Sequence, residues 1–309
     1  MKILVTGGAG YVGSVLVPEL LSAGHQVRVL DNLMFGGQSL LPFFAHPHFE
    51  FVKGDILDEA TVRQCVKDAD VIIHLAAIVG YPACKKDPNL AKDVNVFGSR
   101  IIDRARSKSQ PVLFASTGSN YGALVGDVCT EETPLNPLTI YGQTKTQAEQ
   151  SFLDSGSVIC YRFATAFGLS PRLRLDLLVN DFVYKAMKER NLIIYEKTYK
   201  RTFIHVRDIA RSFMFALENL DTMMDNVYNV GSESMNYSKE EVALKIKEKI
   251  DFYLHFADIG KDEDQRNYEV SYKKINSLGF ETTVDLDQGI EELMRGYQVI
   301  EVRNPYSNV

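Results

Sequence analysis

The chain has 309 residues, of which 45% are apolar and 24% are charged, and its formal net charge is −6. This length suffices for one large domain or two coupled ones, and the composition is ordinary for a soluble globular protein. The mild acidity disfavours a nucleic-acid partner, which requires a basic surface, although a few well-placed arginines can still bind a diphosphate.

The N-terminal segment MKILVTGG has only a short apolar run before threonine and glycine. We therefore expect neither a signal peptide nor a membrane partner, and we expect a cytoplasmic protein. The four cysteines are far apart, at positions 65, 84, 129 and 160, which predicts reduced, mostly buried thiols. His46 and His48 share a loop without further ligands nearby, so no structural metal is expected.

In the first half of the chain, short apolar runs alternate with segments of helical spacing. Strands are predicted at 2–6, 26–30, 49–53, 71–75, 112–115 and 158–163, and helices at 11–23, 61–68, 90–107 and 141–154. Because successive parallel strands need right-handed helical crossovers, this alternation predicts an α/β fold with a Rossmann-type doubly wound parallel sheet.

After Phe167 the rhythm changes. We predict a loop at 168–174, a helix at 175–190, strands at 192–195, 203–206 and 228–230, and a helix from Asp208, as its cap, to Leu220. From Ser238 onward the tail is mainly amphipathic helix with short strands. The larger domain then comprises 1–168 and 201–231, and a smaller mixed α/β C-terminal lobe comprises 169–200 and 232–309.

A glycine-rich turn follows the first strand. Gly7, Gly10 and Gly13 form a GxxGxxG pattern at the start of a helix. In a dinucleotide-binding turn the first glycine allows the tight turn, the second lets the backbone approach a pyrophosphate, and the third permits close helix packing. The helix N-terminus offers free N–H groups to the phosphates. A glycine cluster alone is equally compatible with a flexible turn.

The acid at the end of the second strand supports a dinucleotide. Asp31 lies 18 residues after Gly13 (31 − 13). An acid there bonds the ribose hydroxyls and repels a 2′-phosphate, which favours NAD over NADP. The alternative role for Asp31 is a loop or N-cap residue. Asp55 follows the third strand, where an adenine edge is read, and a simple turn residue is its alternative role.

Tyr141 and Lys145 form a Tyr-x-x-x-Lys pattern on a predicted helix, which places both on one face. A tyrosine pKa is about 10, but a nearby ammonium and a positive nicotinamide ring lower it. Tyr141 then takes a hydroxyl proton as hydride leaves the same carbon for NAD, and Lys145 also holds the nicotinamide ribose. The pattern is frequent by chance in surface helices. Its position after a dinucleotide-binding turn favours catalysis.

A hydroxyl-rich segment ends the strand at 112–115. Side chains at the C-terminal ends of such strands face the cofactor crevice, so Thr117 is the candidate third catalytic residue, bonded to the reacting sugar oxygen. For Ser116 and Ser119 a Ser/Thr turn is the competing interpretation.

These segments together resemble the extended short-chain dehydrogenase/reductase family of nucleotide-sugar epimerases and dehydratases, over nearly the whole chain. The resemblance is carried by TGGAGYVG at 6–13, Asp31-Asn32, Gly54-Asp55, HLAA at 74–77, Asn95, STGSNYG at 116–122, YGQTK at 141–145, RFATAFG at 162–168 and RTFIHVRDIA at 201–210. It implies Thr117, Tyr141 and Lys145 as the catalytic set. The cofactor residues it implies are Gly7, Gly10, Tyr11, Val12, Asp31, Asn32, Asp55, Ile56, Leu75, Ala76, Ala77, Asn95, Tyr141 and Lys145.

The resemblance also implies substrate residues beside Thr117. Asn180 resembles a substrate-binding asparagine near a helix start, and Arg201 and Arg266 resemble two arginines that grip the diphosphate. Guanidinium forks match phosphate oxygens bidentately. Arg174, with Arg172, is a weaker candidate, since a solvated loop explains both equally.

Two departures from the family pattern bear on the reaction. Sugar 4,6-dehydratases have Asp-Glu directly after the catalytic threonine, where this chain has Gly118 and Ser119, which argues against elimination of water. Thr165 stands where many relatives have asparagine, which removes a usual substrate contact.

Three strings, AIVGYPACKKDP, FGLSPRLRLDLLVNDF and FIHVRDI, look similar to bacterial GDP-heptose 4-dehydrogenases of capsule sugar synthesis. This narrower likeness implies oxidation at C4 of a GDP-sugar with tightly held NAD. A 4-epimerase, which returns the hydride to the other face, stays open, as do a non-catalytic dinucleotide sensor and an NADPH reductase, the last disfavoured by Asp31. The family also implies a homodimer through helices 90–107 and 141–154.

Overall fold

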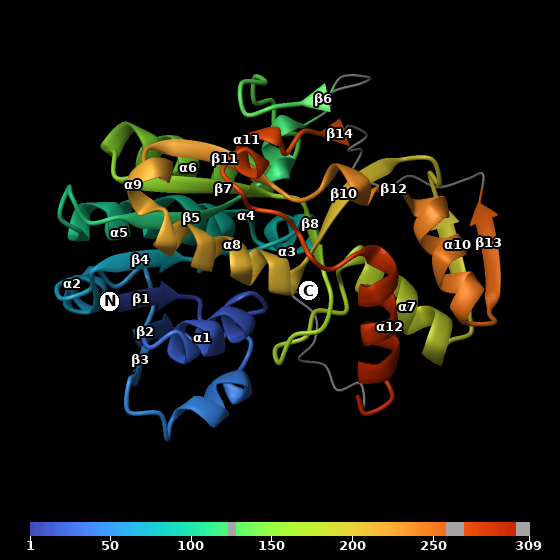
Figure 1. The fold of residues 1–309 in the computed structure, drawn as a ribbon, viewed down its shortest axis with the longest axis horizontal. Coiled ribbons are helices and arrows are strands. Elements are labelled where there is room, and N and C mark those ends of the chain that lie inside the picture. Colours follow the sequence, from blue (N-terminus) through green and yellow to red (C-terminus); the bar gives the residue numbers. More distant parts are fainter. Residues whose placement is uncertain (123–127, 258–268, 301–309) are drawn as a thin grey trace.

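The computed structural model describes residues 1–122, 128–257 and 269–300. A seven-stranded sheet forms its centre, in the order β11-β7-β5-β4-β1-β2-β3, and every neighbouring pair is parallel (Figure 1). The strands are β1 (Lys2–Thr6), β2 (Gln26–Asp31), β3 (Phe49–Lys53), β4 (Val71–His74), β5 (Val112–Thr117), β7 (Val158–Phe163) and β11 (Asn226–Val230). The predicted doubly wound sheet is confirmed, and its strand order reverses between β1 and β4, where such folds bind ligands.

Helices cover both faces of the sheet. One apolar cluster includes α1 (Gly13–Ser22) and α8 (Val206–Glu218), and the other includes α2 (Glu59–Val66), α5 (Ser99–Ala105) and α6 (Ile140–Ser155). Successive residues of β4 alternate between them, since Ile72 belongs to one cluster and Ile73 to the other. This explains why β4 is apolar throughout, as expected for a strand covered on both faces.

The predicted single helix over 90–107 is divided into three parts. Helix α4 (Pro88–Lys92) leads into a wider π-helical turn, η2 (Asp93–Gly98), which leads into α5. Within this turn the Asn95 amide accepts from the Ile78 N–H at 2.8 Å and donates to the Ile78 carbonyl and the Thr144 hydroxyl, both at 3.0 Å. The bulge therefore fastens the loop after β4 to α6.

The predicted helix start at Asp208 is wrong. Helix α8 begins at Val206, directly after β10 (Lys200–His205). Its cap is His205, and the His205 Nδ1 accepts from the Arg207 N–H at 3.3 Å. The Asp208 carboxylate is buried and accepts from the N–H groups of Thr283 and Val284 at 3.0 Å. A buried carboxylate needs such donors, so Asp208 anchors the C-terminal tail.

A third apolar cluster lies beside the sheet and forms a smaller lobe, seen at the right of Figure 1. It contains α7 (Leu178–Lys188), α10 (Lys239–Lys249) and α12 (Leu286–Gly296). Its strands form two small sheets, β13 (Tyr253–Ala257) with β9 (Asn191–Tyr195), and β12 (Asn236–Ser238) with β10 and β8 (Thr165–Phe167). The predicted lobe boundaries stay a prediction.

The remaining elements are short. They are η1 (Gln38–Phe43), α3 (Tyr81–Lys86), η3 (Gly118–Tyr121), β6 (Val128–Cys129), α9 (Leu220–Met223), η4 (Glu233–Met235), β14 (Glu269–Val270) and α11 (Lys273–Asn276). All four cysteines are buried thiols. Within the described ranges we find no helix with the length and apolarity that a bilayer span requires, and no group of three or more metal-ligating side chains.

Candidate active site

The glycine turn leaves no room for a side chain at Gly7 or Gly13. Gly7 has a φ of +73°, and a Cβ there would lie 2.7 Å from the Ala76 nitrogen; a Cβ on Gly13 would lie 2.5 Å from the Gly8 Cα. The constraint on Gly13 thus comes from the turn itself rather than from packing of helix on strand. Val12 caps α1 without a side-chain acceptor, which suits a helix N-terminus that binds phosphate.

Gly13→Ala is expected to weaken NAD binding at least about tenfold, because relief of the clash displaces the phosphate-binding backbone. Calorimetric titration with NADH measures this. Gly24→Ala, just after the other end of α1, is the control for backbone strain alone: its φ of +81° disfavours alanine although nothing lies within 4 Å of the added Cβ, and it is expected to keep the wild-type affinity for NAD. Equal affinity of Gly13→Ala and wild type would show that this turn does not hold the cofactor.

Asp31 faces the glycine turn from the end of β2. Its carboxylate accepts from the N–H groups of Ala9 at 3.0 Å and Leu33 at 2.8 Å. Burial raises the pKa of this carboxyl, and these two backbone donors oppose the rise. Asn32 donates to Asp55 at 2.9 Å, which joins the ends of β2 and β3, and Asp55 also accepts from the Leu57 N–H in a local turn.

A single cavity of about 1050 Å³ connects the glycine turn with the predicted catalytic residues. Its wall includes most of the residues selected from the sequence: Gly7, Gly10, Tyr11, Val12, Asp31, Asn32, Asp55, Ile56, Leu75, Ala76, Ala77, Thr117, Tyr141, Lys145, Arg174 and Arg201. The volume lies at the upper end of the range for small-molecule sites.

Two predicted ligand contacts lie behind this wall instead. Asn95 bonds the Ile78 backbone, as described above. Asn180 accepts from the Gly168 N–H at 2.9 Å and donates to the Arg174 carbonyl at 2.8 Å, so it orders the segment 168–174. Both amides serve the backbone because buried polar groups are satisfied by their nearest partners. Arg266 lies outside the described residues.

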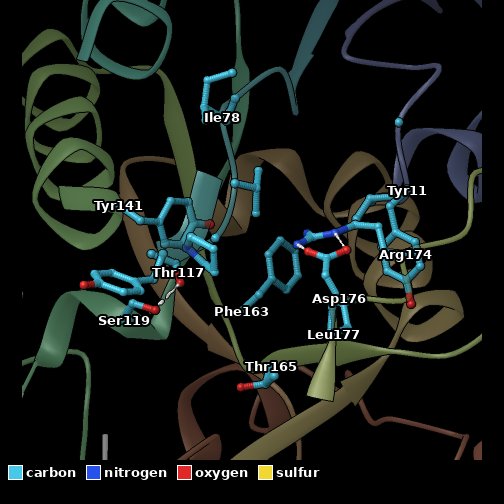
Figure 2. A pocket seen from close by; sticks show the side chains of 18 of the residues that line it. Tyr11, Ile78, Thr117, Ser119, Tyr141, Phe163, Thr165, Arg174, Asp176 and Leu177 are labelled. Carbon is cyan, nitrogen blue, oxygen red and sulfur yellow. Dashed lines mark hydrogen bonds and ion pairs between the residues drawn. The ribbon is translucent and has the colours of Figure 1, made fainter. Parts of the chain in front are cut away.

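Thr117 and Tyr141 lie at one end of the cavity (Figure 2). Thr117 ends β5, where its hydroxyl donates to the Ser119 hydroxyl and accepts from the Ser119 N–H, both at 3.2 Å. Tyr141 lies in the first turn of α6, which Thr139 caps by accepting from the Gly142 N–H at 3.1 Å. The ends of two neighbouring elements therefore bring a hydroxyl and a phenol to one end of the cavity.

Lys145 lies one helical turn after Tyr141 and is 2% exposed. Its ammonium is 3.9 Å from the centre of the Phe114 ring. Burial lowers the pKa of Lys145 to about 7, while the nearby Cys160 and Glu149 oppose this effect. An amine with this pKa exchanges a proton at neutral pH.

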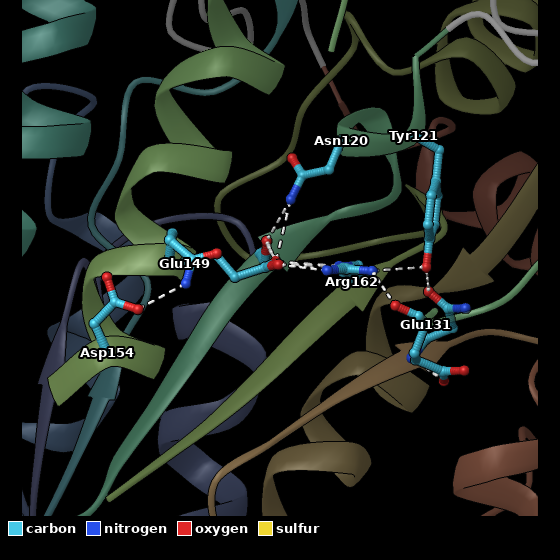
Figure 3. A network of polar contacts seen from close by, with 9 residues as sticks. Asn120, Tyr121, Glu131, Glu149, Asp154 and Arg162 are labelled. Carbon is cyan, nitrogen blue, oxygen red and sulfur yellow. Dashed lines mark hydrogen bonds and ion pairs between the residues drawn. The ribbon is translucent and has the colours of Figure 1, made fainter. Parts of the chain in front are cut away.

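Behind the predicted catalytic residues, Glu149 of α6 joins three elements (Figure 3). It accepts from the Arg162 guanidinium of β7 at 2.7 Å, from the Ser116 hydroxyl of β5 and from the Asn120 amide at 3.1 Å. Arg162 also donates to the Tyr121 hydroxyl at 3.1 Å. This buried network fixes the relative positions of β5, which carries Thr117, and α6, which carries Tyr141.

Glu149→Gln is expected to destabilise the protein by about 3 kcal/mol, because it leaves the buried Arg162 charge uncompensated. Urea denaturation measures the change. Glu59→Gln serves as the control, since it breaks only an exposed pair with Arg63 on α2 and is expected to cost less than about 1 kcal/mol. If both variants lost the same small amount, the network would not carry this stability.

The arginines of the segment 168–174 line the cavity. Arg172 and Arg174 are both buried, so the solvated-loop alternative for them is wrong. Arg174 pairs with Asp176 at 2.5 Å, and Arg172 lies 4.4 Å over the Phe35 ring. The Tyr11 hydroxyl donates to the Gly168 carbonyl at 2.8 Å, which fastens this segment to the glycine turn.

Several further residues line the cavity without a role predicted from the sequence: Phe35, Lys85, Lys86, Lys185 and Lys239. Lys85 and Lys86 belong to the segment AIVGYPACKKDP at 77–88, one of the three segments that carry the narrower likeness. No sequence signal distinguished Lys239, because only the folded lobe brings it to the cavity.

The model of the NAD dependent epimerase/dehydratase family matches residues 3–231. The chain belongs to this family. A putative UDP-glucose 4-epimerase of Methanocaldococcus jannaschii is 29% identical, with 94% of this chain and 97% of that protein covered. A dTDP-glucose 4,6-dehydratase of an Actinoplanes species is 30% identical, over 96% and 98% of the two chains.

Solved structures share the fold. The UDP-glucose 4-epimerase of Thermotoga maritima, with UDP-glucose, superposes with a TM-score of 0.86 at 24% identity, over 96% of this chain and 99% of that chain. The dTDP-glucose 4,6-dehydratase of Bacillus anthracis, in complex with NAD, gives a TM-score of 0.83 at 26% identity, over 96% of both chains.

These comparisons confirm the resemblance to the epimerase/dehydratase family and the expected cofactor. The protein is an NAD-dependent enzyme that modifies a nucleotide sugar. The glycine turn, the uncapped start of α1 and Asp31 fit NAD. The names of the relatives given above specify UDP-glucose and dTDP-glucose. They therefore do not support the narrower likeness to GDP-heptose enzymes.

Proposed function

We propose that this enzyme oxidises the C4 hydroxyl of a nucleotide-activated sugar and stops at the 4-keto product. On the narrower sequence likeness, the proposed substrate is GDP-heptose, and the proposed setting is capsule or surface polysaccharide synthesis by a cytoplasmic homodimer. The observation that carries the proposal is the shared cavity, which is lined by Tyr141 and Thr117 as well as by the glycine turn.

The charge of the cavity supports a diphosphate ligand. Although the chain carries a net charge of −6, lysines and arginines outnumber carboxylates in the cavity lining. The cations are Lys85, Lys86, Lys145, Lys185, Lys239, Arg172, Arg174 and Arg201, and the acids are Asp31, Asp55, Asp176 and Asp181. A cavity lined in this way concentrates anions and offers guanidinium forks to phosphate oxygens.

In the proposed reaction Tyr141 acts as the base that takes the C4 hydroxyl proton. Thr117 holds the same oxygen by a hydrogen bond, and protonated Lys145 favours the Tyr141 phenolate. Bound NAD supplies the hydride acceptor. The Ser119 N–H holds the Thr117 oxygen at the end of β5, and in the proposed complex the Thr117 O–H that now donates to the Ser119 hydroxyl turns to the sugar oxygen.

The residues after Thr117 disfavour a 4,6-dehydratase. Gly118 carries no side chain, and the Ser119 hydroxyl that lines the cavity is neither an acid nor a base of the required strength. Elimination of water needs both, so we propose that oxidation at C4 is not followed by elimination.

A 4-epimerase is the second candidate. The UDP-glucose 4-epimerases among the relatives favour it, and its first step is the same oxidation at C4. In the epimerase the 4-keto sugar rotates in the cavity and the hydride returns to its other face, whereas in the dehydrogenase the 4-keto sugar is released.

Incubation of the enzyme with GDP-, UDP- and dTDP-sugars, followed by mass spectrometry and NMR, tests the proposal. A 4-keto product lighter by two hydrogens supports the dehydrogenase. An isomer of unchanged mass supports the epimerase, and a product that has lost water contradicts both.

A further inference from the structure

Lys239 is a buried lysine on the cavity wall that the proposed reaction does not use. It lies in the first turn of α10, is 6% exposed, and lines the cavity together with Tyr195 of β9. Its ammonium donates to the Tyr195 carbonyl at 3.1 Å. Burial of a lysine is costly, which favours a role for its charge in the cavity.

Lys239 lies on the lobe side of the cavity near Arg201, because Arg201 of β10 pairs with Tyr237 of β12, two residues before Lys239. Tyr141 lies on the α6 side of the cavity, whereas α10 and β9 belong to the separate lobe formed by the third apolar cluster. In a nucleotide sugar the base is separated from the reacting sugar by the ribose and the diphosphate. With the sugar placed at Tyr141 and the diphosphate at Arg201, we place the base beyond Arg201, against Lys239 and Tyr195, which line the same cavity.

We propose that Lys239 recognises a keto oxygen on the edge of the nucleobase, O6 of guanine or O4 of a uracil-type base, beside the Tyr195 ring. An ammonium is only a donor, so it attracts a keto oxygen and opposes the amino group of adenine or cytosine at that edge. Tyr195 is 42% exposed and offers a ring face for the base to stack on. This inference rests on the proposed function.

The test compares two pairs of nucleotides whose bases carry keto against amino at this edge: UDP with CDP, which differ only there, and GDP with ADP, which also differ by the 2-amino group of guanine. Each is titrated calorimetrically into the NAD-loaded protein. GDP and UDP are expected to bind at least about tenfold more tightly than ADP and CDP, the value of one charge-assisted hydrogen bond. The comparison of GDP with UDP identifies which keto base the enzyme prefers.

Lys239→Met is expected to reduce each keto-to-amino preference to less than about threefold, while Lys239→Arg retains it. The matched control is Lys247→Met on the same helix, because Lys247 also donates to a carbonyl, that of Phe252 at 2.6 Å, but does not line the cavity. This control is expected to keep the wild-type preference.

Equal binding of the keto and amino partners by wild type, or an undiminished preference in Lys239→Met, would overturn the role of Lys239. Failure of the proposed function gives a different result, since no nucleoside diphosphate would then bind to wild type although NAD does. Loss of GDP, UDP and NAD binding alike in Lys239→Met, with Lys239→Arg also lacking the preference, would count against base recognition.

Discussion

Tyr141→Phe is expected to lower turnover by at least about a thousandfold, while the protein still binds NAD. Removal of the phenol oxygen takes away the proposed base without changing the ring, and positioned acid–base groups contribute about 10²–10⁴ in rate. Tyr141 is partly buried at the start of α6, and the ring that packs there is retained. The expected loss is therefore in turnover, with little change in stability.

Turnover is followed as NADH absorbance in a single-turnover experiment, and bound NAD is followed by native mass spectrometry. Tyr253→Phe is the control, because this exposed tyrosine lies outside the cavity and is expected to keep wild-type activity. Activity of Tyr141→Phe within about tenfold of wild type would show that another group takes the proton.

The convergence of Gly7, Asp31 and Thr117 on one cavity could be predicted from sequence because each belongs to a short motif at the end of a strand. Gly7 follows β1, Asp31 ends β2 and Thr117 ends β5, all in one parallel sheet. The C-terminal ends of parallel strands meet at one edge, so the topology alone brings these residues to one crevice. Lys145 follows from helical spacing relative to Tyr141.

Residues whose partners are distant in the chain were harder to interpret. Asn95 and Asn180 have the side chains of ligand-binding residues, yet each bonds backbone that folding brings beside it. Asp208 has the appearance of a helix cap, but its donors come from Thr283 and Val284, about 75 residues later. No local pattern encodes which distant backbone a polar side chain will meet.

Whether a charged loop residue is exposed or buried also depends on what the loop packs against. Arg172 and Arg174 are buried because hydrogen bonds between Tyr11 and Gly168 and between Ser14 and Ser170 fasten their segment to the cofactor turn. The sequence contains these side chains without indicating that they meet.

Lys145→Met is expected to abolish turnover and at the same time to stabilise the cofactor-free protein by about 2–4 kcal/mol at pH 6. The lysine is 2% exposed, and burial lowers its pKa to about 7 from an ordinary 10.5. At pH 6 the folded protein therefore carries a buried charge at a cost that methionine, of similar length, avoids.

The pH dependence identifies the cause. Between pH 7 and 10.5 the unfolded chain keeps the Lys145 proton that the folded chain has released, so the unfolded state binds more protons and the stability contributed by this group rises with pH. The stability difference between Lys145→Met and wild type should be largest below pH 7 and shrink toward pH 10.5. Urea denaturation across this range measures it, with the exposed Lys108→Met as control.

If the stability difference between variant and wild type were constant from pH 6 to pH 10.5, or if the variant were less stable than wild type at pH 6, the Lys145 ammonium would not destabilise the folded protein through its burial. The combination of effects also separates function from folding. Replacing a residue that has only a structural role makes the protein less stable. Replacing Lys145 is instead expected to make the protein more stable and inactive, because its buried ammonium acts on the phenol of Tyr141 and on the bound ribose.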